Sequence, residues 1–172
     1  NGMSWLVRLW SEQISVQVPD AELHVYSSLL FRGSKTRLPD PALSEILQLV
    51  AQSYSSRVKI FAPVPDAQMA EVYTGARAHL YPGDPRDLLC PTLGDSQASG
   101  LPAVGRDLGG VGERLLNGKS GFLAKDDDVF KKRVIRLVND DDFFMEASKV
   151  AKKEQSKRSW DDVASDLERI FS

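Results

Sequence analysis

Two aspartates in the middle of the chain have the residue type and the spacing of a ligand-binding pair. Asp87 and Asp95 are separated by seven residues, and Pro91 lies between them. Proline suits the first position of a helix because its φ is fixed near the helical value and its missing N–H would have no partner there. We therefore expect Asp87 in a loop and Asp95 early in a helix over residues 91–99, with both carboxylates facing one cleft.

The expected start of this helix also offers backbone donors. Cys90, the residue before the proline, is a poor N-cap, and nothing nearby in the sequence accepts the amides of Thr92 and Leu93. Open amides and the helix dipole favour an anion such as a phosphate, and ionised aspartates accept hydrogen bonds from sugar hydroxyls. The segment therefore predicts a site for a phosphorylated, polyhydroxylated ligand. The alternative is a loop with two solvated acids beside an ordinary helix.

Short apolar runs and amphipathic segments alternate along the chain, which is typical of an α/β fold. The strands expected from the apolar runs lie at 23–26, 58–61, 79–81, 102–105 and 122–124. The helices expected from periods near the helical repeat lie at 3–18, from 41 past 50, at 67–74, 91–99, 113–116, 127–139, 141–157 and 160–171. Together they predict a Rossmann-like parallel sheet sandwiched by helices, with further helices at the C-terminus.

Local signals predict how several of these helices begin. Asp40-Pro41 has the form of a cap followed by a first helical residue, and Asp66 is expected to cap the helix that it precedes. Ser159 and Asp162 have the spacing of a capping box. Residues 29–39 show no period and are expected to form a loop.

The two segments with the strongest chemical character fall on one edge of the expected sheet. The acidic segment follows the third strand, and Gly109-Gly110 follow the fourth. Ligands of parallel α/β sheets bind beyond the carboxyl ends of the strands. We therefore expect the acidic segment and the glycines to contribute to the same site.

Composition limits the class of protein. At 172 residues with a net charge of −2, we expect one domain over 1–172 and no general attraction to nucleic acid. One cysteine and two histidines predict neither a disulfide nor a metal site. No apolar run reaches the length of a membrane span and no signal peptide is visible, so we expect a cytoplasmic protein. The basic run at 152–158 is a solvated face or a peripheral contact with the cytoplasmic membrane face.

Several motifs, in order, resemble the C-terminal, donor-binding half of retaining GT-B glycosyltransferases of family four, the group 1 glycosyl transferases. The family pattern E-x7-E is matched by Asp87 and Asp95, and the later patterns G-G-x-x-E, G-x-x-G-x-L and S-W are matched in sequence order. The matching segments are Ala98–Val104, Gly109–Glu113, Asn117–Leu123 and Ser159–Ala164. The resemblance spans nearly the whole chain.

The resemblance implies a nucleotide-diphosphate sugar as substrate, with no cofactor and no metal. It places the transferred sugar and a catalytic charge-stabilising role at Asp87, and the ribose of the nucleotide at Asp95. The backbone near Pro91 falls where the family meets the sugar and the diphosphate, although the proline has no N–H to donate. The predicted donor-binding residues are Asp95, Leu89, Cys90, Thr92, Leu93, Gly109 and Gly110.

The chain departs from the family pattern at the site itself. Both family glutamates are aspartates here, which shortens the reach of each carboxylate by roughly 1–1.5 Å. Two family glycines are replaced by Leu88 and Cys90, so close approach of the backbone to a sugar is less favoured. These changes favour an alternative in which the chain is a degenerate, non-catalytic GT-B half that serves as an assembly or regulatory module.

A second departure lies ahead of the first helix. The family carries a strand there with an Arg and a Lys that pair with the diphosphate, and the chain begins at Asn1-Gly2. We expect a fragment that lacks this strand and an N-terminal acceptor-binding domain, and that does not catalyse transfer alone. The basic residues of the expected loop either substitute for the missing charge or are solvated; they are Arg32, Lys35 and Arg37. A third interpretation is a flavodoxin-like binding or signalling domain with no preference for nucleotide sugars.

Overall fold

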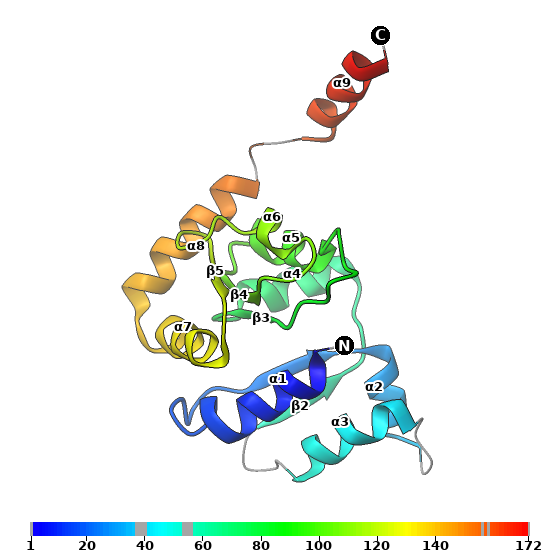
Figure 1. Cartoon of the computed structure of the whole chain (residues 1–172), viewed down its shortest axis with the longest axis vertical. Helices are drawn as coiled ribbons and strands as arrows, with labels where there is room; N and C mark the ends of the chain where they lie inside the picture. The colour runs from blue at the N-terminus through cyan, green and yellow to red at the C-terminus, as the bar shows by residue number, and fades with distance from the viewer. Residues whose placement is uncertain (1, 37–40, 53–56, 156, 158, 172) are drawn as a thin grey trace.

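The computed structural model describes residues 2–36, 41–52, 57–155, 157 and 159–171 and contains two parallel sheets rather than one (Figure 1). One sheet pairs β1 (Leu23–Tyr26) with β2 (Val58–Phe61). The other has the order β3 (His79–Tyr81), β4 (Ala103–Arg106), β5 (Gly121–Ala124). The predicted parallel strands are confirmed, and each lies within one residue of its expected start.

Helices flank both sheets, and most of them occupy the expected ranges. In chain order they are α1 (Met3–Leu9), the π-helix η1 (Trp10–Ile14), α2 (Ser28–Gly33), α3 (Pro41–Gln52), α4 (Asp66–Thr74), α5 (Pro91–Ala98), α6 (Val111–Arg114), α7 (Asp127–Asn139), α8 (Asp141–Gln155) and α9 (Trp160–Phe171). Figure 1 shows α1, α2 and α3 beside β1 and β2, whereas α4 to α8 surround the other sheet and α9 projects away from it. In the part of the chain that the structure describes, no helix has both the length and the apolar character that crossing a bilayer requires.

Two expectations about local structure are wrong, one about a loop and one about a helix cap. The segment expected as a loop at 29–39 contains α2, because the Ser27 side chain accepts a hydrogen bond from the Leu30 amide at 3.3 Å and Leu30 is buried. Asp66 is the first residue of α4 and not its cap; Pro65 holds that position and makes no side-chain hydrogen bond. Asp40 and Arg37 lie outside the described residues.

Other caps form as expected from the sequence. The amide of Asp162 donates to the Ser159 hydroxyl at 3.2 Å, and the Ser159 amide donates to the Asp162 carboxylate at 2.7 Å, which is the reciprocal pair of a capping box. Asp126 caps α7 by accepting from the Val129 amide at 2.8 Å. These bonds satisfy amides that a helix start would otherwise leave without partners.

One apolar core joins the helices of the two sheets. Leu6 and Trp10 from the first helical segment are buried in the same cluster as Phe130 and Val134 of α7. The Trp5 ring lies edge-on to Phe130 with centroids 5.1 Å apart. Burial of this apolar surface holds the two sheets together even though their strands do not pair.

A large cavity separates the facing edges of the two sheets. Within the described residues β1 pairs only with β2, and β3 pairs on one side only, with β4. The cavity has a volume of about 1120 Å³ and is lined by β1 and β3, by α1, and by α7. The start of α1 lies at the end of the cavity that is near the carboxyl end of β3. A Cβ on Gly2, the residue before α1, would lie 2.6 Å from the Cβ of Pro82, which directly follows β3.

Candidate functional site

The helix that follows Pro91 has the unusual start that its sequence predicts. Pro91 is the first residue of α5, and Cys90 holds the N-cap position with no side-chain cap. Cys90 has φ 44° and ψ 53°, a left-handed conformation, which is uncommon for a residue with a Cβ. Its side chain is completely buried, as is that of Leu93. Burial of these two side chains fixes α5 against the β4 side of the sheet.

The backbone donors at this helix start are fewer than expected. The amides of Leu93 and Gly94 both donate to the Cys90 carbonyl, at 3.1 and 3.3 Å. The expectation of a free Leu93 amide is therefore wrong, because the backbone carbonyl of the N-cap residue Cys90 accepts it. Among the described residues we find no acceptor for the Thr92 amide, so one donor remains open.

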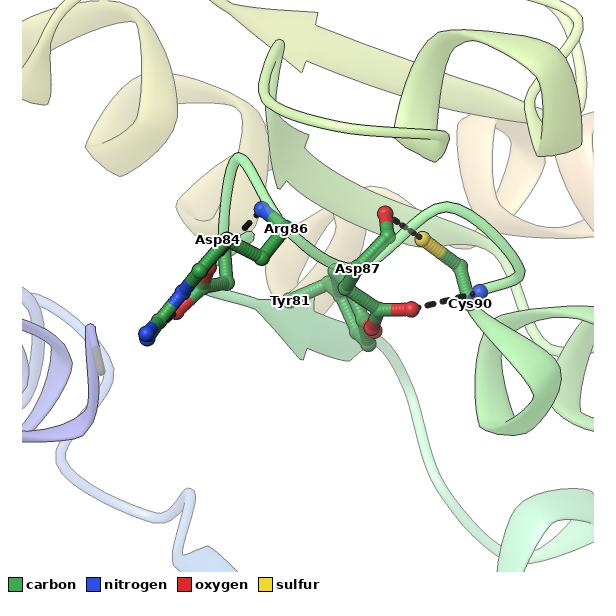
Figure 2. Close-up of polar contacts among 5 residues, drawn as sticks. All are labelled: Tyr81, Asp84, Arg86, Asp87 and Cys90. Atoms are coloured by element: carbon green, nitrogen blue, oxygen red, sulfur yellow. Dashed lines mark hydrogen bonds and ion pairs between the residues drawn. The ribbon is translucent and has the colours of Figure 1, made fainter.

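Asp87 is held by two donors from its own surroundings (Figure 2). One carboxylate oxygen accepts from the Cys90 amide at 2.9 Å, and the other accepts a short hydrogen bond from the Tyr81 hydroxyl. The Tyr81 hydroxyl and the Cys90 amide hold the pKa of Asp87 below its usual range. Burial, with the Asp87 bond second, raises the pKa of Tyr81. Asp87 is therefore an ionised acceptor with a defined orientation.

An ion pair lies at the start of the same loop. Asp84 pairs with Arg86 at 3.1 Å, and hydrogen bonds from Arg86 lower the pKa of Asp84 to about 2. The Asp84 carbonyl also accepts from the Asp87 amide at 3.0 Å. We call residues 84–90 the acidic turn. Its two carboxylates are both bound within the turn or to β3, so the turn is organised without a ligand.

The glycines after β4 pack against the acidic turn. We call residues 107–110 the glycine turn. The Gly110 amide donates to the Asp87 carbonyl at 2.8 Å, and a Cβ on Gly109 or Gly110 would lie 2.3 or 2.2 Å from the carbonyl oxygens of Asp87 or Leu88. No side chain fits at such distances, so glycine is required for this contact. The glycines support the acidic turn from behind.

Asp95 lies one turn into α5 and is exposed. Burial of the phenol, with the negative charge of Asp95 second, raises the pKa of Tyr73. Beneath Asp95, His79 Nδ1 lies 2.7 Å from the Ser96 hydroxyl, which itself donates to the Leu93 carbonyl at 3.0 Å. Desolvation lowers the pKa of His79 to about 4.

The structure brings together three of the predicted site residues. Asp87, Thr92 and Asp95 line the cavity where β3 ends. The other predicted donor-binding residues are not among the described residues of its lining; they are Leu89, Cys90, Leu93, Gly109 and Gly110. Asp87, Thr92 and Asp95 therefore share one space, and the remaining predicted residues lie outside its described lining.

Two contacts of the site have no local sequence signal. Tyr81 appears in the sequence only as the last apolar residue of a strand, and its hydroxyl contact with Asp87 depends on how the turn folds back. Arg114 of α6 donates to the Leu89 carbonyl at 2.8 Å and ties the tip of the acidic turn to the glycine side. Arg32 and Lys35 do not line the cavity within the described residues. The Lys35 ammonium lies 4.0 Å from the Phe31 ring centroid instead.

Comparison of the sequence with known families gives a match over most of the chain. The profile described as glycosyl transferases group 1 matches residues 1–140. Among curated proteins, the D-inositol 3-phosphate glycosyltransferase of Corynebacterium urealyticum is 25% identical over 119 residues, which are 68% of this chain and 28% of that protein. The chain thus spans less than a third of this relative.

Solved structures share the fold. Sucrose-phosphate synthase from Thermosynechococcus elongatus matches with a TM-score of 0.73 and 18% identity, covering 99% of this chain and 41% of that one. The pneumococcal O-GlcNAc transferase GtfA, solved in complex with UDP and GlcNAc, matches with a TM-score of 0.72 and 14% identity, covering 96% and 32%. The architecture is therefore that of part of these larger proteins.

Proposed function

The chain belongs to the glycosyl transferases group 1 family, and from this premise we propose that it is the half of a retaining GT-B glycosyltransferase that binds the nucleotide-sugar donor. The observation that carries the proposal is the placement of Asp87 and Asp95 on one cavity at the carboxyl ends of parallel strands. Ligands of such sheets bind at that edge. Asp87 as an acceptor held by the protein, Asp95 as an exposed acceptor and one open amide there suit a ligand rich in hydroxyls with an anionic centre.

Each residue at this edge has a distinct part in the proposal. Asp95, exposed on α5, accepts hydrogen bonds from the ribose of the nucleotide. The Thr92 amide, at the positive end of the helix dipole, donates to the diphosphate. Asp87 contacts the transferred sugar and stabilises positive charge that develops at the reacting carbon. The proposal assigns no metal ion to this step, in line with the family resemblance.

The whole protein is proposed to carry an acceptor-binding domain as well. The chain spans 28% of the curated relative and 41% and 32% of the two solved chains. We propose that transfer takes place where such a domain meets the edge formed by Asp87 and Asp95. The chain by itself is then expected to bind donor without transferring the sugar.

The cavity between the sheets supports a further part of the proposal. In the part of the chain that the structure describes, the facing edges of β1 and β3 pair with no strand across this space. The start of α1 lies near the carboxyl end of β3. We propose that a longer protein places one more parallel strand there, directly ahead of α1. A five-residue N-terminal extension of β-branched residues should raise the free energy of unfolding, whereas a Gly-Ser extension of equal length should not.

Calorimetry with nucleotides tests the proposal directly. The chain is titrated with UDP, GDP and ADP and with a sugar conjugate of each, and Asp95→Ala is compared with Asp142→Ala, an exposed aspartate in the first turn of α8. We expect one nucleotide series to bind, Asp95→Ala to lose at least tenfold in affinity, corresponding to about 1.4 kcal/mol, and Asp142→Ala to bind like the parent chain. Equal affinities for the two variants would contradict the assigned role of Asp95.

A second candidate function rests on the substitutions in the acidic turn. Leu88 and Cys90 stand where the family pattern has glycines, and Asp87 already accepts two hydrogen bonds from the protein. These features favour a degenerate half that has lost donor chemistry and serves as an assembly or regulatory module. Absence of binding in every titration, with the chain folded by circular dichroism, would support this second function.

A further inference from the structure

The acidic turn keeps a backbone conformation that its residues do not favour. Cys90 has φ 44°, a left-handed value that a residue with a Cβ adopts at a cost and that glycine adopts freely. The conformation has a structural consequence. With Cys90 left-handed, its carbonyl accepts from Leu93 and Gly94 and α5 begins at once. The direction of the open Thr92 amide therefore depends on Cys90.

Side-chain hydrogen bonds hold this conformation in place. The Asp87 carboxylate accepts from the Cys90 amide at 2.9 Å, and the Tyr81 hydroxyl binds the opposite oxygen (Figure 2). Tyr81 is the last residue of β3, so its hydroxyl is anchored to the sheet. The Gly110 amide fixes the Asp87 backbone from the other side at 2.8 Å. Asp87 can rotate away from Cys90 only if the Tyr81 bond breaks.

We propose that Tyr81 is a positioning residue for the donor site: its hydroxyl locks the Asp87 carboxylate onto the Cys90 amide, and this lock keeps Cys90 left-handed and the Thr92 amide aimed into the cavity. The inference rests on the proposed donor binding. A glycine at position 90 would adopt the left-handed conformation freely. In this chain the hydrogen bonds of Tyr81 and Asp87 hold Cys90 in that conformation.

The lock leaves capacity for a ligand. An ionised carboxylate offers about four acceptor positions, and the Cys90 amide and the Tyr81 hydroxyl bind different oxygens of Asp87. The same Asp87 can therefore hold the turn and accept a hydroxyl from the cavity. Tyr81 acts through Asp87 and does not itself touch the ligand in this proposal.

Tyr81→Phe is the primary test, because it removes the hydroxyl and keeps the ring. Two readouts need no ligand: the pKa of Asp87 by carbon NMR, and the hydrogen-exchange protection of the Leu93 amide, which donates to the Cys90 carbonyl. We expect the Asp87 pKa to rise and the Leu93 protection to fall. The third readout is UDP affinity by calorimetry, which should fall about threefold to tenfold, the range for one hydrogen bond.

A second substitution in the Tyr81→Phe variant distinguishes loss of the left-handed Cys90 conformation from a general loss of stability in the acidic turn. Cys90→Gly removes the need for the lock and should restore Leu93 protection and UDP affinity. Cys90→Ala is the matched control: it removes the same thiol, keeps a Cβ, and should not restore either. Rescue by Gly but not by Ala is expected, since only glycine enters the left-handed region freely.

The outcomes that would overturn the proposal are specific. Unchanged Leu93 protection in Tyr81→Phe, or equal rescue by Cys90→Ala and Cys90→Gly, shows that Tyr81 does not position the turn. If the parent chain binds no UDP, donor binding by this nucleotide fails while the lock is still judged by the Asp87 pKa and the Leu93 protection. If the lock readouts change as expected but UDP affinity does not, Tyr81 is structural only and the proposal is wrong.

Discussion

The acidic turn and the glycine turn touch each other and satisfy similar backbone demands by different means. In the glycine turn, Gly109 has φ 59° and the contact with the neighbouring carbonyls leaves no room for a Cβ. In the acidic turn, Cys90 has φ 44° and carries a buried side chain. The first turn uses the absence of a side chain, and the second uses a network of hydrogen bonds.

The difference decides what each turn can do. The glycine contact is steric and involves no ionisable group, so it should respond to volume and not to pH. The acidic turn depends on Asp84, Asp87 and Tyr81, whose pKa values are all shifted by their mutual contacts and surroundings. Groups that hold the backbone there also face the cavity. The glycine turn is therefore a steric support without ionisable groups, whereas the acidic turn is held by groups that can gain or lose a proton.

The largest expected effect comes from adding one carbon to the steric support. In Gly110→Ala the new Cβ would lie 2.2 Å from the Leu88 carbonyl oxygen and 2.8 Å from its carbon, so the backbone of one turn must move. We expect a loss of about 3 kcal/mol in the free energy of unfolding. Urea denaturation measures this loss, and it should be the same at pH 5 and pH 7.

Gly118→Ala is the control for that measurement. Gly118 has φ 80° and nothing within 4 Å of the position of its Cβ, so only the conformational cost of about 1 kcal/mol remains. Gly110 has φ −83°, which any residue adopts, so equal losses in the two variants would show that the backbone accommodates the new Cβ without the cost expected for close approach. The two turns would then differ less than the contacts indicate.

A smaller effect, a dependence of stability on pH, should come from His79 of β3, which contacts Ser96 of α5. Desolvation lowers the pKa of His79 to about 4, so the unfolded chain binds a proton between about pH 6.5 and pH 4 that the folded chain does not. The stability is fully present above pH 6.5 and falls toward pH 4. We expect this histidine to account for a loss on the order of 2 kcal/mol over that range.

Substitution of the two histidines isolates this contribution. His79→Gln should remove the fall in stability between pH 6.5 and pH 4, measured by urea denaturation at several pH values. His24→Gln is the control, since the His24 side chain is 41% exposed, and it should keep the fall. A fall that persists in His79→Gln would show that the support beneath α5 does not titrate through His79.

Much of the fold could be predicted because its signals are local. The strands at 23–26, 58–61 and 79–81 match their apolar runs, and α7 matches its predicted bounds because Asp126 caps it and Phe130, Val134 and Leu137 repeat on one buried face. The short α2 has too few residues to show a period. The division of the sheet into two pieces depends on pairing between distant strands, which no local pattern reports.

The candidate site divides in the same way. Pro91 at the first position of α5 is a local signal, and with it the placement of Asp87 and Asp95 on one cavity followed from their spacing. The Leu93 amide was expected to be free because Cys90 has no capping side chain, but the backbone carbonyl of Cys90 accepts it. The contact of Tyr81 with Asp87 depends on the path of the turn in three dimensions, to which the sequence gives no guide.

The smallest expected effect concerns the outer ion pair of the acidic turn. Arg86 lowers the pKa of Asp84 to about 2, so this contribution to stability is present above about pH 4 and is lost as the pH falls toward 2. In Arg86→Gln the pKa of Asp84, followed by carbon NMR, should return toward about 3.9, with little change in stability because the Arg86 side chain is 87% exposed. Arg106→Gln, which removes an arginine that lies over Trp5, should leave the Asp84 titration unchanged. If Arg86→Gln also weakens protection of the Leu93 amide, the outer pair takes part in holding Cys90, and the support of the acidic turn extends beyond Tyr81 and Asp87.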